Sequence, residues 1–214
     1  MSGDVPEKGL KLEYAAAGWT VAGAIAALAA GAIAGSIALI AFGLDSAIAG
    51  AAACMLVLRV RRKRADPEAV SPHIAAGKTR FVFGVSFFLL ALYLLNESAS
   101  RLYYGEKPET NIAGIVLAAL SLVVMIVLTV LKLRLAAAPE IRPFREYARE
   151  TAARGFLSLV LLVGLGLHAL YGWWWADPAA ALLMVPVIIL EGWTAVESSK
   201  ESGRDEINGT RTPD

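Results

Sequence analysis

Residues 36–60 read SIALIAFGLDSAIAGAAACMLVLRV, a stretch whose only charged members are Asp45 and, near its end, Arg59. About 20 consecutive, mostly apolar residues are enough for a helix to cross the hydrocarbon core of a bilayer. Inside lipid, backbone N–H and C=O groups have no water to bond, so an isolated segment of this kind must be helical. The stretch therefore predicts a transmembrane helix.

The rest of the chain repeats this pattern. Overall, 57% of its 214 residues are apolar and 18% are charged, against about 45–50% and 25% in soluble domains. The sequence predicts an all-α, polytopic membrane protein with six transmembrane helices at 14–32, 36–60, 81–104, 112–135, 151–175 and 179–198. Its domains are a cytoplasmic N-terminal tail (1–11), the six-helix transmembrane domain (12–198) and a disordered cytoplasmic tail (199–214).

The basic residues predict the orientation. If the N-terminus lies inside, every Lys and Arg except Arg101 and Lys107 falls on the inner side. Cytoplasmic segments carry this excess in membrane proteins, so both termini are expected in the cytoplasm. The small, alanine-rich chain suggests a plasma membrane, here a bacterial inner membrane. The run RVRRKR at 59–64 fits the border of such a segment and an anionic lipid surface. No nucleic-acid partner is expected, and the polar first residues do not resemble a signal peptide.

Signals of enzymatic chemistry are missing from the sequence. It contains no phosphate-binding loop, dinucleotide fingerprint, nucleophile elbow or Cys-x-x-Cys pair. The single cysteine, Cys54, cannot form an internal disulfide, and His73 and His168 cannot by themselves build a zinc site. The chain is therefore expected to be no enzyme and to hold no bound cofactor.

Ionisable residues inside the predicted spans are the candidates for function. A charge at the bilayer centre costs about 2.5–3.5 kcal/mol on insertion scales. Asp45 is the main candidate, as a cation ligand, a proton carrier or the partner of a buried base. His168 and Glu191 also lie deep in the predicted spans. We interpret His168 as a packing residue more than as a ligand. Glu191 is either a functional group or a structural anchor. Lys132 lies nearer a helix end, where its ammonium can reach water.

Two runs resemble a known family. FGLDS at 42–46 and GWWWADP at 172–178 resemble the cation diffusion facilitator, or cation efflux, family. The resemblance covers residues 12–197 and fits a short branch without the usual cytoplasmic metal-binding domain. It implies a homodimer of six-helix protomers in the lipid bilayer. Each protomer would export a divalent cation, typically zinc, in exchange for protons.

The resemblance also implies where the metal binds. The family places two ligands one helical turn apart on the second helix and a similar pair on the fifth. Asp45 matches the first position, but Ala49 occupies the second. On the fifth helix Thr151 stands near the first position, and Arg154 and Gly155 stand where a ligand is expected. The candidate metal ligands are Asp45 and Thr151, with supporting or proton-linked roles for Ser46, Arg154, His168 and Glu191.

Arg154 suggests a different arrangement, because a guanidinium repels a divalent cation and would neutralise a buried aspartate. We therefore hypothesise an Asp45–Arg154 salt bridge in place of the metal. Three functions stay open on the sequence alone. They are a cation transporter, a non-transporting scaffold or regulatory partner of the same fold, and a transporter of another substrate.

Overall fold

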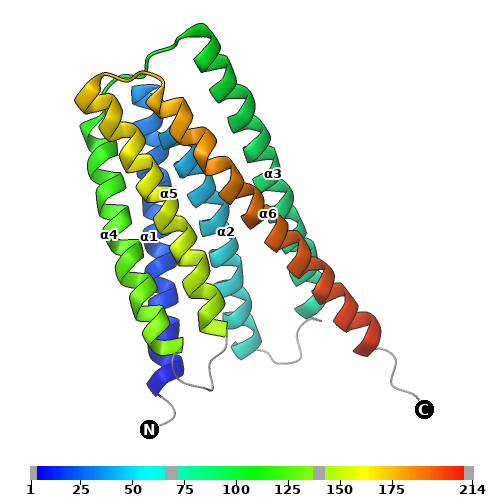
Figure 1. The fold of residues 1–214 in the computed structure, drawn as a ribbon. Coiled ribbons are helices and arrows are strands. Elements are labelled where there is room, and N and C mark those ends of the chain that lie inside the picture. The colour runs from blue at the N-terminus through cyan, green and yellow to red at the C-terminus, as the bar shows by residue number, and fades with distance from the viewer. Residues whose placement is uncertain (1–3, 66–71, 137–142, 210–214) are drawn as a thin grey trace.

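The computed structural model describes residues 4–65, 72–136 and 143–209. Within these ranges the chain forms six α-helices and no strands (Figure 1). The all-α prediction is therefore confirmed. The helices are α1 (Asp4–Ala34), α2 (Ile37–Ala65), α3 (Pro72–Tyr104), α4 (Ile112–Ala136), α5 (Pro143–Tyr171) and α6 (Ala176–Gly209).

Each helix contains a stretch long and apolar enough to span a membrane, which confirms the six predicted spans. The stretches are Leu12–Ala34, Ile37–Met55, Gly77–Tyr104, Ile112–Arg134, Arg149–Tyr171 and Ala176–Lys200. They agree with the predicted segments because hydropathy determines which segments enter lipid. A continuous helix then satisfies the backbone hydrogen bonds of so long an apolar run.

The connection between α5 and α6 lies earlier than predicted. Helix α5 ends at Tyr171, and Gly172 adopts a φ of 66°, a conformation that glycine reaches without a Cβ clash. The three tryptophans 173–175 form the connection, whereas Asp177 and Pro178 lie in the first turn of α6. Proline is accepted there because the first helical N–H groups have no partner within the helix.

Two helices extend into the segments predicted as tails. Helix α1 already begins at Asp4, and α6 continues to Gly209, so the expected disorder after residue 198 does not describe 199–209. Adding residues to an existing helix is far easier than starting a new one. The ends of both predicted tails, residues 1–3 and 210–214, lie outside the described residues.

Successive helices run antiparallel, so the bundle has two distinct ends. At the loop end lie the connections α1–α2, α3–α4 and α5–α6. At the terminal end α1 begins and α6 ends (Figure 1). The most extensive packing joins α3 to α6, α4 to α5 and α1 to α2, while α2 also touches α3, α5 and α6. Helix α2 therefore reaches the centre of the bundle.

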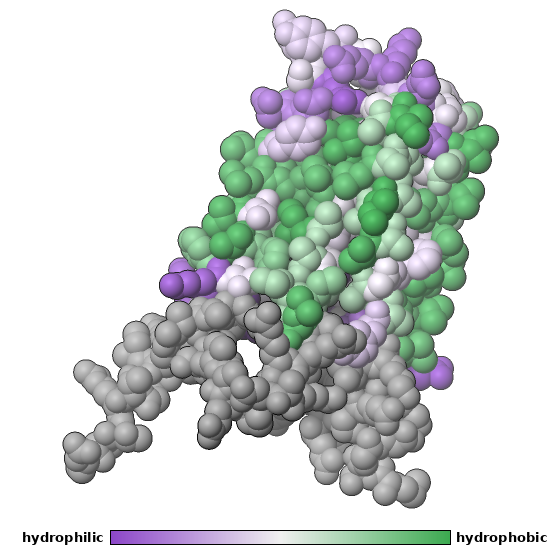
Figure 2. Space-filling model, turned by 180° about the vertical axis from the view of Figure 1, so that it is seen from behind, coloured by the Kyte–Doolittle hydropathy of each residue, from purple (hydrophilic) through white to green (hydrophobic). Residues whose placement is uncertain are grey.

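The surface between the two ends is apolar. Figure 2 shows a broad hydrophobic band on one face, with hydrophilic residues gathered at the loop end. Large apolar side chains such as Ile25, Leu89 and Leu190 are more than half exposed. A water-soluble monomer rarely shows so large a continuous apolar surface. The exposed band is therefore the surface that contacts lipid, and the protein is a multi-pass membrane protein.

A close helix crossing fixes the position of α6. A Cβ added to Gly84 of α3 would lie 2.9 Å from the carbonyl oxygen of Gly192 on α6 and 2.5 Å from the Val196 side chain. Near the terminal end, the Ser199 hydroxyl donates to the Gly77 carbonyl at 2.8 Å. Small residues allow such an approach in membranes. The crossing holds α6 on α3 directly beside Glu191.

Candidate functional site

Asp45 lies at the centre of the site. Helix α2 places it in the core of the bundle, where the residue is 1% exposed. Among the described residues, neither of its carboxylate oxygens has a hydrogen-bond partner. Burying a carboxylate without a partner is strongly unfavourable. Because packing alone gives no reason for this charge, Asp45 has the character of a binding residue.

The proposed Asp45–Arg154 salt bridge is absent from the structure, and that hypothesis is wrong for this conformation. The Arg154 guanidinium instead donates to Glu150 at an Nη2–Oε1 distance of 2.7 Å. Glu150 lies one turn earlier on α5, a spacing at which helical side chains meet without any change of backbone. The Nε of Arg154 stays buried without a hydrogen-bond partner among the described residues.

Glu191 brings a second carboxylate to the same region from α6. Its Oε1 is buried and has no hydrogen-bond partner within the described part of the chain. Asp45, Arg154 and Glu191 stand on three helices, α2, α5 and α6, that pack against one another, and each has a buried polar atom without a hydrogen-bond partner among the described residues. Together with Glu150, the partner of Arg154 that the sequence did not indicate, they are called the core cluster here.

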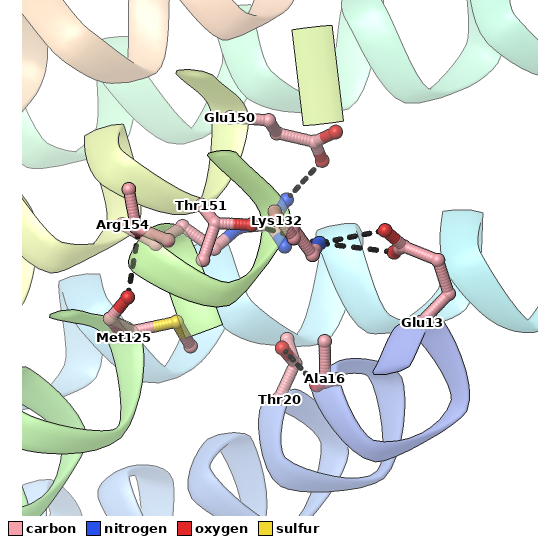
Figure 3. Close-up of polar contacts among 9 residues, drawn as sticks. Glu13, Ala16, Thr20, Met125, Lys132, Glu150, Thr151 and Arg154 are labelled. Atoms are coloured by element: carbon pink, nitrogen blue, oxygen red, sulfur yellow. Dashed lines mark hydrogen bonds and ion pairs between the residues drawn. The ribbon is translucent and has the colours of Figure 1, made fainter. Parts of the chain in front are cut away.

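Thr151 faces a different neighbour. Figure 3 shows Lys132 of α4 between Glu13 of α1 and Thr151 of α5. The Lys132 Nζ lies 2.9 Å from Glu13 Oε1 and 2.9 Å from Thr151 Oγ1. Lys132 is only 3% exposed, so the expectation that it reaches water from a helix end is wrong. An ammonium beside the Thr151 hydroxyl repels a second cation, which makes Thr151 a poor metal ligand.

The remaining predicted residues differ in their distance from this cluster. Ser46 is 4% exposed beside Asp45 in the chain, and Ala49 packs in the apolar core. His168 does not lie deep in the membrane: it is in the last turn of α5, with its Nδ1 3.4 Å from the Trp173 carbonyl oxygen at the loop end. His168 therefore belongs to the α5–α6 connection and not to the site.

No group of three or more His, Cys, Asp and Glu side chains is arranged to hold a metal ion anywhere in the described ranges. The cluster offers two carboxylates with unpartnered oxygens, Asp45 and Glu191, beside an arginine that already has an anionic partner. Such a site can hold a cation only if water or backbone oxygens complete its coordination.

Asp177 forms a second polar centre, at the loop end. Its Oδ1 accepts a hydrogen bond from the Ser36 hydroxyl at 2.5 Å, and its Oδ2 accepts one from the Ile37 N–H at 2.8 Å. The Ser36 hydroxyl in turn accepts from the Leu39 N–H at 3.1 Å. The carboxylate thereby satisfies the first N–H groups of α2, where a negative charge also suits the helix dipole.

Two neighbouring contacts hold the same turn. The Arg101 guanidinium donates to the Gly35 carbonyl oxygen, and the Asn111 amide donates to the Ala30 carbonyl at 2.9 Å. Gly35 itself has a φ of 61°, which lets the chain reverse between α1 and α2. Residues from α3, the start of α4 and α6 therefore all fasten the α1–α2 turn.

Fold and site together define a multi-pass membrane protein with a buried, unpartnered aspartate in its helical core. Comparison with known families identifies it further. Residues 14–202 match the cation efflux transmembrane domain. The chain belongs to the cation efflux family, and the resemblance seen in its sequence is confirmed. No curated protein matches the chain.

Proposed function

We propose that this protein transports a divalent metal cation across the membrane in exchange for protons, and that Asp45 binds the cation. The observation that carries the proposal is the pair of buried, unpartnered carboxylate oxygens of Asp45. Membership of the cation efflux family supports transport as the activity. Zinc, the cation that the family resemblance implies, is the first to test.

The chemistry of a buried carboxylate supports exchange. In a low-dielectric core the negative charge of Asp45 must be compensated, either by a cation or by a proton. The same oxygens cannot hold both at once, so arrival of a proton favours release of the metal. Arg154 does not provide this compensation in the observed conformation because it is paired with Glu150.

The proposal includes a location and an assembly. The basic residues favour termini in the cytoplasm, which would make the terminal end the cytoplasmic end and the direction of transport outward. The family resemblance supports a homodimer, and the small, alanine-rich chain favours a bacterial inner membrane. A thiol-reactive reagent that cannot cross the membrane, applied to a variant with a single cysteine at Lys107, tests the orientation, since this loop-end residue should react from outside.

A second candidate is a non-transporting protein of the same fold that acts as a scaffold or a regulatory partner. It is favoured by Ala49, which packs in the core where a second ligand is expected. It is also favoured by Arg154, a positively charged residue at a position of α5 where the family resemblance expects a ligand.

The test is a flux measurement in liposomes that contain the purified protein. Zinc and manganese uptake is followed under an imposed pH gradient, beside Asp45→Ala. Flux that depends on the gradient and is lost in Asp45→Ala supports the transporter. No flux of either metal from well-folded protein would favour the non-transporting candidate.

A further inference from the structure

We propose that Glu13 of α1 and Thr151 of α5 form a site for a monovalent, ammonium-type cation, and that Lys132 of α4 fills this site as a cation attached to the chain. Lys132 thereby determines specificity, because its charge keeps free cations away from Thr151, the first position on α5 where the family resemblance expects a ligand. The site goes beyond the proposed function, since it does not include Asp45.

Oxygen atoms from two other helices surround the Lys132 ammonium (Figure 3). Its Nζ lies 2.9 Å from Glu13 Oε1, 3.1 Å from Glu13 Oε2 and 2.9 Å from Thr151 Oγ1. All of these are hydrogen-bond or ion-pair distances. An ammonium has three N–H donors and no acceptor, so it needs oxygen atoms on several sides. Glu13 and Thr151 supply them as they would to a free ammonium ion.

The ammonium is buried, which is rare for lysine unless it is paired. Lys132 is 3% exposed and Thr151 is 6% exposed, whereas the Glu13 side chain is 30% exposed. A buried positive charge is costly unless a negative charge compensates it, and Glu13 supplies that charge. The site therefore binds the ammonium in its interior and is open to water on the side of Glu13.

The charge of the site selects the class of ion. One carboxylate balances one positive charge, whereas a divalent ion would leave a buried positive charge uncompensated. Glu150, the residue before Thr151, is already paired with Arg154 at 2.7 Å, so this pair adds no net charge. Lysine carries its ammonium on a flexible hydrocarbon stem. The matching free ion is therefore ammonium or a primary alkylammonium.

The site lies at the terminal end of the membrane-spanning region. Glu13, Lys132 and Thr151 are one or two residues inside the ends of their spans, which are Leu12–Ala34, Ile112–Arg134 and Arg149–Tyr171. Helix α1 begins, α4 ends and α5 begins at this end of the bundle (Figure 1). A small cation can therefore reach the site from water without crossing the apolar core, once Lys132 no longer occupies it.

The experiment removes the attached cation and supplies a free one. Lys132→Ala deletes the side chain beyond Cβ, a fragment with the shape of n-propylammonium. Thermal unfolding of the purified full-length protein in detergent is followed by circular dichroism. Lys132→Ala should unfold at a lower temperature than wild type, and n-propylammonium at about 100 mM should restore about half of the lost midpoint, because a ligand stabilises the state that binds it. The wild-type midpoint should not respond.

Two variants and two compounds serve as controls. Adding Glu13→Gln to Lys132→Ala should abolish the restoration, because it removes the charge that holds the cation. Met125→Ala opens an apolar cavity at a buried position of the same helix, so it should lose stability without responding to the amine. n-Propanol lacks the charge and tetramethylammonium lacks N–H donors, so neither should restore the midpoint of Lys132→Ala.

An unchanged midpoint of folded Lys132→Ala in n-propylammonium would overturn the inference, as would an equal gain in Met125→Ala or in the double variant. Should Lys132→Ala not fold, Lys132→Met replaces it, because methionine fills the apolar part of the cavity and leaves room for an ammonium ion. Ammonium chloride must then raise the midpoint above that in tetramethylammonium chloride, and equal midpoints would overturn the inference. Metal flux is not measured and Asp45 is unaltered, so either result leaves the proposed function standing.

Discussion

The bundle contains two buried aspartates, Asp177 and Asp45, which differ in their hydrogen bonding. At the loop end, Asp177 is fully buried and accepts hydrogen bonds from the Ser36 hydroxyl and the α2 backbone. In the core, Asp45 is equally buried, yet both of its oxygens lack a partner in the described part of the chain. The first carboxylate holds helices together. The second is kept at a cost to stability, as expected for a binding site.

The largest loss of stability should follow from disrupting the hydrogen bonds of Asp177. Asp177→Asn removes the charge and half of the acceptor capacity that the Ser36 hydroxyl and the Ile37 N–H use. We expect a loss of ~2–3 kcal/mol in the free energy of unfolding, the range for a buried, charged hydrogen-bonded cap. Denaturant unfolding in mixed micelles measures it. Glu109→Gln, at an exposed loop-end residue, is the control, and equal losses in both variants would contradict a special role for Asp177.

A smaller loss is expected at the Lys132 contact. Lys132→Met leaves Glu13 without its cation and removes the hydrogen bond from Lys132 to Thr151. Because Glu13 is partly exposed, water compensates some of the loss, and we expect ~1–2 kcal/mol. The double variant with Glu13→Gln should recover about half of this, since it no longer leaves an unpaired carboxylate. The same unfolding assay measures both variants. A double variant that is less stable than Lys132→Met alone would argue against the ion pair.

The smallest change in stability, a gain and not a loss, is expected at Asp45. Asp45→Asn removes a buried charge that has no partner, so the protein should gain ~1 kcal/mol in the free energy of unfolding or stay unchanged while losing cation flux. Unfolding and liposome flux are measured on the same preparation. A destabilisation as large as that of Asp177→Asn would mean that Asp45 has a structural role, and the contrast between the two centres would then disappear.

The sequence predicted the spans well because hydropathy alone decides which segments enter lipid. Helix ends were harder to place. The three tryptophans at 173–175 extend the apolar run of the fifth helix, but Gly172 ends that helix before them. The polar residues after 198 resemble a disordered tail, although α6 continues through them to Gly209.

The site was only partly predictable. Asp45 was found because it is a charged residue within an apolar run. The family resemblance directed attention to Arg154. The partner of Arg154 was missed because the hypothesis considered only the buried aspartate and not Glu150, one turn away on the same helix. Lys132 lies near the end of α4, as expected, but its burial was missed because that burial depends on how α1, α4 and α5 pack. No local pattern contains that information.

The Asp177 contact also bears on the order of events during synthesis. Asp177 follows Ser36 by 141 residues, so α1 and α2 leave the ribosome long before the group that caps α2 has been made. Until then the first N–H groups of α2 must bond water or lipid headgroups at the membrane surface. The arrival of the last hairpin, α5–α6, therefore completes a helix made near the beginning, and a chain truncated before residue 177 should leave the α1–α2 hairpin incompletely folded.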